Sequence, residues 1–390
     1  MKRKNYEIIV FSDEWNGLPF SCKHLLRHFL PDVPIMWVEL IGLRSPRLNV
    51  FDLARAINKM TGWISKGMRL KELLPKNLYI LDPFQIPYNE FAIVRYLNRK
   101  IIIRALKRFS EKRPKVERVV LTTWPFIGNI VGSLGERLSI YYRVDDLSEL
   151  PGVNKDLIYG LEKELIDKID MVIASAENLT KLGVEGKVAK YLPHGVDFDY
   201  FRTGQTESKK IVASIQSISH PVVGFFGILN SWIDFDLLSQ VAIDHPDWSF
   251  AIIGPSMIHP SSLPKVPNIH YLGKVSYEEL PLHARHFDVA MIPFKINGLT
   301  ISVNPLKLME YFSLGLPVVS TPLPEVTKFQ DHVFVASSAK TFGDAIQKAL
   351  EEDDENSRIS RQEIARCQSW KKQSMILRGW IEAALDEKMA

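Results

Sequence analysis

Lys307 and Glu310 stand one helical turn apart in the stretch 304–321, which predicts a helix, a tight turn and a buried strand. Pro305 suits the first helical turn, where its missing N–H costs nothing, and Gly315 is typical of a helix end. The β-branched run that follows is typical of a parallel strand buried on both faces. A lysine at a helix N-terminus adds its ammonium to free N–H groups and the positive end of the helix dipole, a combination that suits a diphosphate.

Glu310 supplies the other half of this predicted site. A carboxylate one turn after the ammonium can accept hydrogen bonds from both hydroxyls of a ribose. Together the two side chains predict a nucleotide-diphosphate pocket. The alternative is an ordinary amphipathic helix that carries an incidental Lys–Glu pair, because short motifs also occur by chance.

Asp145 and Asp146 follow the predicted strand 140–144. Ligands of parallel α/β sheets bind at the carboxyl ends of the strands, so an aspartate there can act as the general base for an acceptor hydroxyl. Which of the two would act stays open. The alternative is that the pair caps the loop that follows, as aspartates often do.

Asp13, Trp15 and Trp124 lie in loops that follow the predicted strands 8–11 and 119–123. The start of the chain predicts a Rossmann-like strand, loop and helix, without a GxGxxG motif. Aromatic faces suit sugar rings, so these residues are candidate contacts of an acceptor. For Trp15 the alternative is that its ring caps the local core.

The composition is that of a soluble globular protein of 390 residues, long enough for two cores, with 46% hydrophobic and 24% charged residues. A net charge of +4 does not argue for nucleic acid. Cys22 and Cys367 are far apart and are expected to be free thiols in a reducing compartment. No apolar run has the length of a signal peptide or of a membrane span. We therefore expect a cytoplasmic protein, with the inner face of the membrane as a further location.

In the segment 89–115, the eight Lys and Arg residues from Arg95 to Arg113 are interleaved with apolar residues at helical spacing. A basic helix with an apolar face can lie on an anionic membrane, which would make the protein a peripheral membrane protein. The alternative is a crossover helix whose apolar face packs on the sheet and whose basic face is solvated. Both interpretations hold if the basic side faces a membrane.

Strand patterns divide the chain into two α/β halves. We expect an N-terminal acceptor domain over 1–197, a donor domain over 198–368 that begins with a linker at 198–220, and a last helix over 369–390 that crosses back to the first domain. The expected strands are 8–11, 35–39, 78–81, 119–123, 140–144, 171–175 and 190–192, and then 222–227, 249–254, 269–273, 288–293, 318–321 and 333–335.

The stretch 304–321 resembles the donor-binding signature of GT-B glycosyltransferases, and is most similar to the bacterial teichuronic-acid and xanthan types. The turn 193–197 resembles the Pro-Asn-Gly-Val-Asp turn at the crossing between the two GT-B domains, with His194 in place of Asn. The resemblance implies two Rossmann-like domains facing a central cleft, and it implies that Glu310 holds the nucleotide ribose. Many relatives carry a second Glu where this chain has Ser302.

The resemblance also implies donor phosphate contacts near the turn at 227–236, where relatives often supply Arg and Lys. This chain has none there, so Lys307 would carry the phosphate charge nearly alone. Similar enzymes of the xanthan type use an aspartate of the acceptor domain as base. No DxD motif follows a strand of the second half, so no metal is expected. The implied donor-binding residues are Glu310, Lys307, Asn304, Pro305, Ser302, Gly227, Asn230 and His194.

The expected function is that of a metal-independent hexosyltransferase for cell-surface polysaccharide synthesis. It would move a sugar from a UDP- or GDP-linked donor to a glycan or lipid-linked acceptor, with no other cofactor. Two alternatives stay open: a GT-B epimerase that turns over the nucleotide sugar without any acceptor, and a non-catalytic subunit that only binds the nucleotide sugar. The identity of the sugar, the acceptor and the stereochemical outcome stay open as well.

Overall fold

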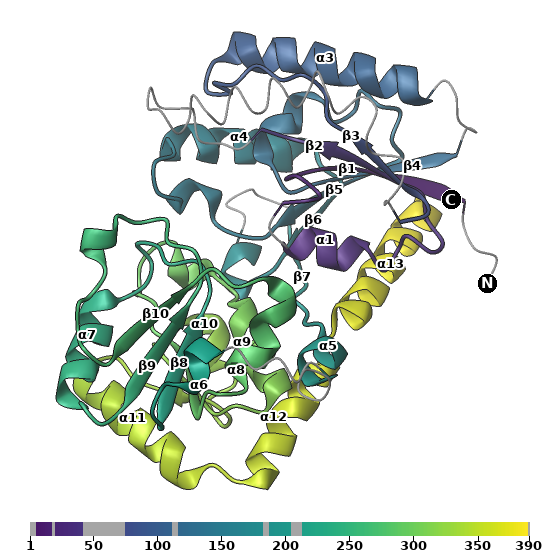
Figure 1. Cartoon of the computed structure of the whole chain (residues 1–390). Coiled ribbons are helices and arrows are strands. Elements are labelled where there is room, and N and C mark those ends of the chain that lie inside the picture. Colours follow the sequence, from purple (N-terminus) through teal and green to yellow (C-terminus); the bar gives the residue numbers. More distant parts are fainter. Residues whose placement is uncertain are drawn as a thin grey trace. The chain divides into compact units, whose positions relative to one another are not determined.

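The computed structural model describes residues 5–17, 20–41, 75–110, 116–181, 187–203 and 213–388 (Figure 1). The chain divides into two compact units, one of Met1–Leu192 with Ser374–Ala390 and the other of Pro193–Gln373. The second unit thus begins at Pro193 rather than at residue 198, and the final segment joins the first unit from Ser374 rather than from residue 369.

The first unit is built on a parallel sheet with the strand order β3-β2-β1-β4-β5-β6-β7. From β1 the chain adds β2 and β3 on one side of the sheet and then β4 to β7 on the other, so the strand order reverses between β1 and β4, as in a Rossmann sheet. Ligands of such folds bind beyond the carboxyl ends of the strands at this reversal. The strands are β1 Tyr6–Ser12, β2 Ile35–Glu39, β3 Leu78–Leu81, β4 Glu117–Thr122, β5 Leu138–Arg143, β6 Met171–Ala174 and β7 Lys190–Tyr191.

Helices cover both faces of the first sheet. α3 (Ala92–Ser110) and α4 (Lys155–Lys168) lie on one face, and α1 (Ser21–Leu26) and the final helix α13 (Trp370–Glu387) lie on the other (Figure 1). Because both faces are covered, every residue of β1, β2 and β5 is buried. Ile102 and Leu106 of α3 pack into the same core as Ile9 and Phe11 of β1.

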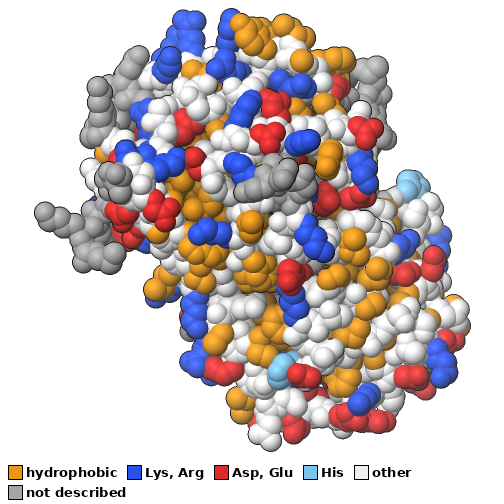
Figure 2. Space-filling model, turned by 180° about the vertical axis from the view of Figure 1, so that it is seen from behind, with side chains coloured by type: hydrophobic (Ala, Val, Ile, Leu, Met, Phe, Trp, Pro, Cys, Tyr) orange, Lys and Arg blue, Asp and Glu red, His pale blue; other side chains and the backbone are white. Residues whose placement is uncertain are grey.

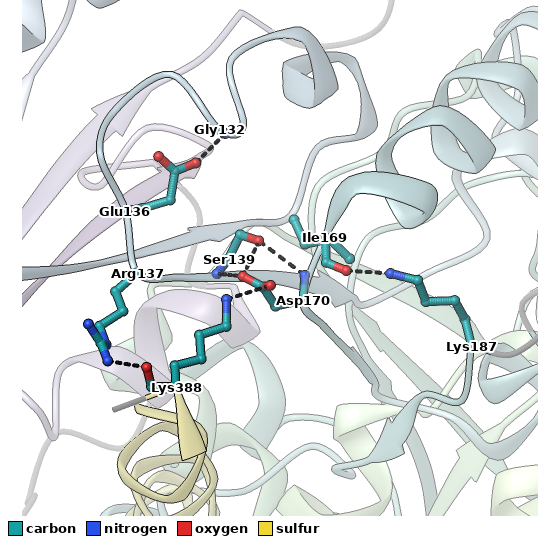
Figure 3. A network of polar contacts seen from close by, with 8 residues as sticks. All are labelled: Gly132, Glu136, Arg137, Ser139, Ile169, Asp170, Lys187 and Lys388. Carbon is teal, nitrogen blue, oxygen red and sulfur yellow. Dashed lines mark hydrogen bonds and ion pairs between the residues drawn. The ribbon is translucent and has the colours of Figure 1, made fainter. Parts of the chain in front are cut away.

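Polar contacts hold the end of the chain on the first unit (Figure 3). Lys388 donates to Asp170 at 2.6 Å, and the Arg137 guanidinium donates to the backbone carbonyl of Lys388. Asp170 also accepts from the backbone N–H and the hydroxyl of Ser139, each at 2.8 Å. The charged end of the chain is therefore tied to the loops before β5 and β6.

The second unit repeats the plan with the parallel order β10-β9-β8-β11-β12-β13, which reverses between β8 and β11. The expectation of two Rossmann-like α/β sheets is therefore confirmed. The strands are β8 Val222–Phe226, β9 Ser249–Ile253, β10 Ile269–Gly273, β11 Val289–Ile292, β12 Val318–Ser320 and β13 Phe334–Val335.

Helices also line the second sheet. α7 packs on α11, which contacts β11 and β12, whereas α8 and α9 contact each other and are packed on β8, β11 and β12. α5 and α12 pack against α9. The bounds are α5 Phe198–Thr203, α6 Ala213–Gln216, α7 Phe235–Asp244, α8 Leu280–Ala284, α9 Leu306–Leu314, α10 Pro324–Thr327, α11 Ala339–Glu352 and α12 Glu355–Cys367.

The expected linker at 198–220 is not a plain linker where the structure describes it. Residues 198–203 form α5, whose Phe198 and Phe201 are buried in the core of the second unit. Residues 204–212 lie outside the described part of the chain. The aromatic residues account for the difference, because a helix that buries two of them gains more from packing than a solvated linker would.

Candidate functional site

Lys307 lies where the second sheet reverses its direction of growth. It stands in the first turn of α9, and its Nζ is 5.6 Å from the ring centre of Phe225 in β8. The ring centre of Phe294, which follows β11, is 5.7 Å from the same Nζ. Since β8 and β11 are the strands that flank the reversal, the ammonium occupies the position at which ligands bind such sheets.

Two glycines leave the backbone open around this ammonium. Gly227 has a φ of +151°, and a Cβ there would lie 2.2 Å from Cε and 2.7 Å from Nζ of Lys307. Gly254 has a φ of +143°, and a Cβ there would lie 1.9 Å from the carbonyl oxygen of Gly227. Both positions therefore require glycine. Gly227 was identified from the sequence, but Gly254 was not, although a glycine directly after β9 was a visible signal.

Glu310 shares the electrostatic environment of Lys307. Burial raises the pKa of Glu310 to about 7, an effect that the Lys307 charge opposes and that Asp197 reinforces. Burial lowers the pKa of Lys307 below its ordinary value, and Glu310 opposes that shift. Both residues keep some accessible surface, yet burial has the largest effect on each pKa. A desolvated ammonium of this kind favours an anionic ligand.

α9 is held in place by contacts at its middle and its end. The Tyr311 hydroxyl accepts a hydrogen bond of 3.1 Å from the backbone N–H of Phe226, and the two rings pack edge to face. Gly315 ends the helix in the left-handed region, as predicted. Pro305 occupies the N-cap rather than the first turn. Tyr311 was not singled out from the sequence, because a tyrosine in a helix does not reveal which backbone group it meets.

The turn with His194 lies where the chain enters the second unit. Val196 pairs with Ser369, and its N–H donates to Gln368 at 2.9 Å. A Cβ at Gly195 would lie 2.6 Å from the backbone nitrogen of Trp370, so a glycine is needed here as well. The buried His194 ring lies 6.0 Å from the Trp370 ring. Through Asp197, the turn reaches the electrostatic surroundings of Glu310.

The other expected donor residues are placed in two loops. Ser302 is buried at the end of a short 3-10 helix, Thr300–Ser302, and Asn304 stands between that helix and α9. Asn230 follows β8, and its side-chain oxygen accepts from the backbone N–H of Ser231 at 2.7 Å. The structure thus brings Lys307, Gly227 and Glu310 together, while Asn230 makes a local turn contact.

Asp145 and Asp146 have different surroundings at the end of β5. Asp146 accepts from the backbone N–H of Ser148 at 3.2 Å and from its hydroxyl at 2.6 Å, and so caps the 3-10 helix Leu147–Glu149. Burial, and then the neighbouring Asp146 charge, raise the pKa of Asp145 to about 7. A carboxyl group with that pKa can exchange a proton near neutral pH.

Asp13 and Trp124 follow β1 and β4, the strands that flank the reversal of the first sheet. Ser12 and Thr123, which precede them, share a hydrogen bond of 2.8 Å. Burial raises the pKa of Asp13 to about 6, and a hydrogen bond from its own backbone N–H, with a smaller effect of the Trp124 indole, partly offsets that rise. The buried indole N–H has no hydrogen-bond partner among the residues that the structure describes, so it makes only a loose contact with Asp13.

Trp15 is packed into the first unit. Only 6% of its surface is exposed, and its ring meets Trp37 edge to face at 4.9 Å. Its backbone N–H donates to Glu39 at 3.0 Å, and Lys23 lies over the ring at 5.1 Å. These contacts favour the core-packing alternative for Trp15 over a role as a platform for sugar.

The described ranges of the chain contain neither a metal-binding group of side chains nor a membrane-spanning helix. Within them, no three or more His, Cys, Asp or Glu side chains are grouped closely enough to hold a metal ion. The same ranges contain no helix that combines the length and the apolar character needed to cross a membrane.

Comparison with protein families matches residues 220–352 to the family described as "Glycosyl transferases group 1". TuaH of Bacillus subtilis (strain 168), provisionally assigned as a teichuronic acid biosynthesis glycosyltransferase, is 27% identical over 238 residues. That match covers 55% of this chain and 57% of TuaH. The chain is thus aligned with little more than half of its curated relative.

Solved structures match the chain over the length of both units. Anabaena Alr3699/HepE in complex with UDP and glucose has a TM-score of 0.68 at 13% identity, and covers 97% of this chain and 100% of its own. The alpha,alpha-trehalose 6-phosphate synthase of Burkholderia multivorans has a TM-score of 0.65 at 11% identity, and covers 99% of both chains. At these identities the likeness concerns the fold, which is the GT-B arrangement of two parallel α/β sheets.

Proposed function

We propose that the protein is a glycosyltransferase, and the match of residues 220–352 to the family described as "Glycosyl transferases group 1" supports this proposal. It takes a sugar from a nucleotide-diphosphate donor and joins it to a glycan or a lipid-linked acceptor. The observation that carries the proposal is the position of the Lys307 ammonium. It lies against the glycine backbone at the reversal of the second sheet, with Glu310 one turn further along α9.

The donor half of the reaction follows from these residues. The diphosphate accepts from the Lys307 ammonium and from backbone N–H groups at the start of α9, while Gly227 and Gly254 let it approach the backbone. When the bond between the anomeric carbon and the diphosphate oxygen breaks, the negative charge that develops on the leaving group is stabilised by Lys307. Glu310 accepts from the ribose hydroxyls. The UDP and UDP-glucose in the Anabaena structures support a uridine nucleotide, and GDP-linked sugars are the other candidates.

The acceptor half is assigned to the carboxyl edge of the first sheet. Asp145 takes the proton from the acceptor hydroxyl, whose oxygen then bonds to the anomeric carbon. Its pKa of about 7 suits that step near neutral pH. Asp146 holds the loop by capping. The loose Asp13–Trp124 contact offers a hydroxyl both an acceptor and a donor, and so supports a role in orienting the acceptor.

The proposed setting is cell-surface polysaccharide synthesis, which the similarity to TuaH supports. Cys22 and Cys367 are both free thiols. Free thiols are typical of a reducing compartment, and they support a location in the cytoplasm.

A thermal-shift screen of nucleotide sugars tests the proposal. A ligand at a hundred times its dissociation constant stabilises a protein by about 2.7 kcal/mol, so a true donor raises the melting temperature of the wild type. The same ligand should have far less effect on Lys307→Ala. If no nucleotide sugar stabilises the protein, the proposal is wrong. A ligand that binds and is turned over without any acceptor would indicate an epimerase instead, and one that binds without turnover would indicate a binding subunit.

A further inference from the structure

α3 presents one face to the core and another to the outside. Ile102 and Leu106 are buried against the first sheet, so α3 is a crossover helix between β3 and β4. Its other side packs against nothing that the structure describes. We define the α3 patch as the exposed residues on that side together with the segment that leads into the helix: Phe84, Tyr88, Phe91, Ile93, Tyr96, Leu97, Lys100, Arg104, Lys107 and Arg108.

The first half of the α3 patch is apolar. Its six hydrophobic residues, from Phe84 to Leu97, leave between 38% and 63% of their surface exposed. Single exposed hydrophobic residues are ordinary on a protein surface, but a contiguous group of large ones marks an interaction site. A merely solvated helix face, one of the two interpretations of the sequence, does not account for these side chains.

The second half of the patch is cationic. Lys100, Arg104, Lys107 and Arg108 are exposed, and none of the 19 residues of α3 is acidic. Figure 2 shows hydrophobic and basic side chains side by side along the upper edge of the first unit, over α3. Lys100 lies 4.5 Å from the ring centre of Tyr96, at the junction of the two halves.

Two of the arginines expected on the basic face are turned inward instead. Arg95 donates to the backbone carbonyls of Asn89 and Glu90, at 2.8 Å and 2.9 Å. Arg99 donates to the carbonyl of Asn129 at 2.6 Å and to the Ser133 hydroxyl at 2.9 Å. These two side chains hold the helix to neighbouring loops and are not part of the α3 patch.

We propose that the α3 patch docks on the surface of a bilayer that contains anionic phospholipid. The aromatic and aliphatic half enters the boundary between headgroups and acyl chains, where amphipathic rings are favoured. The cationic half lies on the headgroups and neutralises their negative charge. Charge complementarity selects this occupant, because a surface with four exposed cations and no acidic residue on its helix suits a surface of negative charge. The inference does not depend on the proposed transferase activity.

Co-sedimentation with vesicles tests the two halves separately. The probes are vesicles of phosphatidylcholine alone and of phosphatidylcholine with phosphatidylglycerol. The wild type should bind only the mixed vesicles, and 0.5 M salt should release most of it because salt screens the charges. Arg104→Glu/Lys107→Glu/Arg108→Glu should lower binding by at least about tenfold, and Phe91→Ser/Ile93→Ser should lower it by a similar factor.

Matched variants elsewhere serve as controls. Lys163→Glu/Lys265→Glu/Lys274→Glu makes the same change in net charge at exposed residues outside the α3 patch. Ile243→Ser/Ile359→Ser removes two exposed apolar side chains of the second unit. Both controls should bind like the wild type, and all variants should keep the wild-type melting temperature within a few degrees.

Three results would overturn the proposal. One is equal binding to neutral and mixed vesicles. Another is loss of binding in the controls to the same extent as in the patch variants. The third is binding that depends on the cations but not on Phe91 and Ile93, since the patch would then take a soluble polyanion. Competition by dextran sulfate would detect that last case.

Discussion

The ammonium of Lys307 occupies the space that a side chain at position 227 would fill, since a Cβ on Gly227 would stand 2.7 Å from Nζ. A lysine in the first turn of α9 and a glycine after β8 therefore form one unit of structure. The position of the Lys307 charge therefore depends on the absence of a Cβ at Gly227, eighty residues earlier in the chain.

Gly227→Ala should displace this ammonium. We expect the affinity for UDP-glucose to fall by at least about tenfold, because a charge-assisted contact contributes roughly 1.5–3 kcal/mol. The melting temperature should fall as well, since a φ of +151° is strained for alanine. Calorimetry measures the first effect and a thermal scan the second.

Gly160→Ala is the matched control. It lies in α4, where a Cβ would meet nothing within 4 Å, so alanine should leave binding unchanged and stabilise the helix slightly. If Gly227→Ala binds UDP-glucose as tightly as the wild type does, Lys307 is not the diphosphate ligand.

Glu310 predicts a pH dependence. Its pKa is raised to about 7 in the folded protein, above the ordinary value near 4.3. The folded state therefore binds the proton more tightly than the unfolded state, and this carboxyl makes the apo protein less stable as pH rises between those two values. Glu310→Gln should remove that loss, so that the variant without ligand is more stable than the wild type at pH 8 but not at pH 4.

A rise in pH should weaken the fold of the wild type but strengthen its binding of the nucleotide. UDP-glucose has no group that titrates near pH 7, so its affinity for the wild type should rise from pH 6 to pH 8 as Glu310 ionises and accepts from the ribose. Glu310→Gln should bind more weakly, with a flat pH profile. A wild-type profile that is equally flat would contradict the ribose assignment.

The ion pair between Lys388 and Asp170 should hold the end of the chain less strongly in acid. Burial opposes ionisation of Asp170, but hydrogen bonds from Lys388 and Ser139 outweigh it and hold the pKa below its ordinary value. This contribution to stability is present above the unfolded pKa near 3.9 and is lost as pH falls through the lower folded pKa.

Lys388→Ala should therefore lower the free energy of unfolding at pH 7. The pair is about one third exposed, so the expected loss is only about 0.5–1 kcal/mol. Urea titration should give nearly equal stabilities for variant and wild type below the folded pKa of Asp170. Lys348→Ala, which breaks a more exposed pair with Glu352, should change less at pH 7. A Lys388→Ala effect that persists unchanged in acid would mean that packing, and not the ion pair, holds the end of the chain.

Local pattern predicted more of the fold than of the site. β-branched and aromatic runs such as 6–12 and 222–226 mark strands because burial on both faces demands them. Lys307 and Glu310 were found because both lie in one helix. Phe294 and Gly254 were not, because they meet Lys307 and Gly227 only after separate strands pair.

The direction in which a side chain points was the other feature that the sequence could not predict. Spacing alone predicts that α3 is basic, yet Arg95 and Arg99 turn inward because carbonyls of neighbouring loops lie within reach. The exposed aromatic residues that complete the α3 patch start in the segment before the helix, outside the periodic pattern. The helical period of a sequence assigns residues to faces of the helix. It does not reveal which hydrogen-bond acceptors of neighbouring loops lie within reach of a long side chain.

Asp145 and Asp146 should respond differently to substitution by asparagine. Asp145→Asn keeps the shape of the side chain and removes the proton acceptor. Transfer should fall by roughly 10²–10⁴-fold, the usual contribution of general base catalysis, while the affinity for the nucleotide sugar stays near the wild-type value. Asp146→Asn should instead weaken the cap on Ser148. Because asparagine caps a helix about as well as aspartate does, the change should lower the stability by less than about 1 kcal/mol, with a much smaller loss of transfer.

The transfer rate of the wild type should also depend on pH. The pKa of Asp145 is about 7, so transfer should rise as pH increases through that value and the base loses its proton. Initial rates, donor affinity and melting temperature measured on both variants distinguish the roles. If Asp145→Asn loses activity only in proportion to lost folding, the residue is structural. If both variants transfer sugar at wild-type rates and the product retains the anomeric configuration, no carboxylate base acts here, and the enzyme belongs with the retaining glycosyltransferases despite having Ser302 in place of their glutamate.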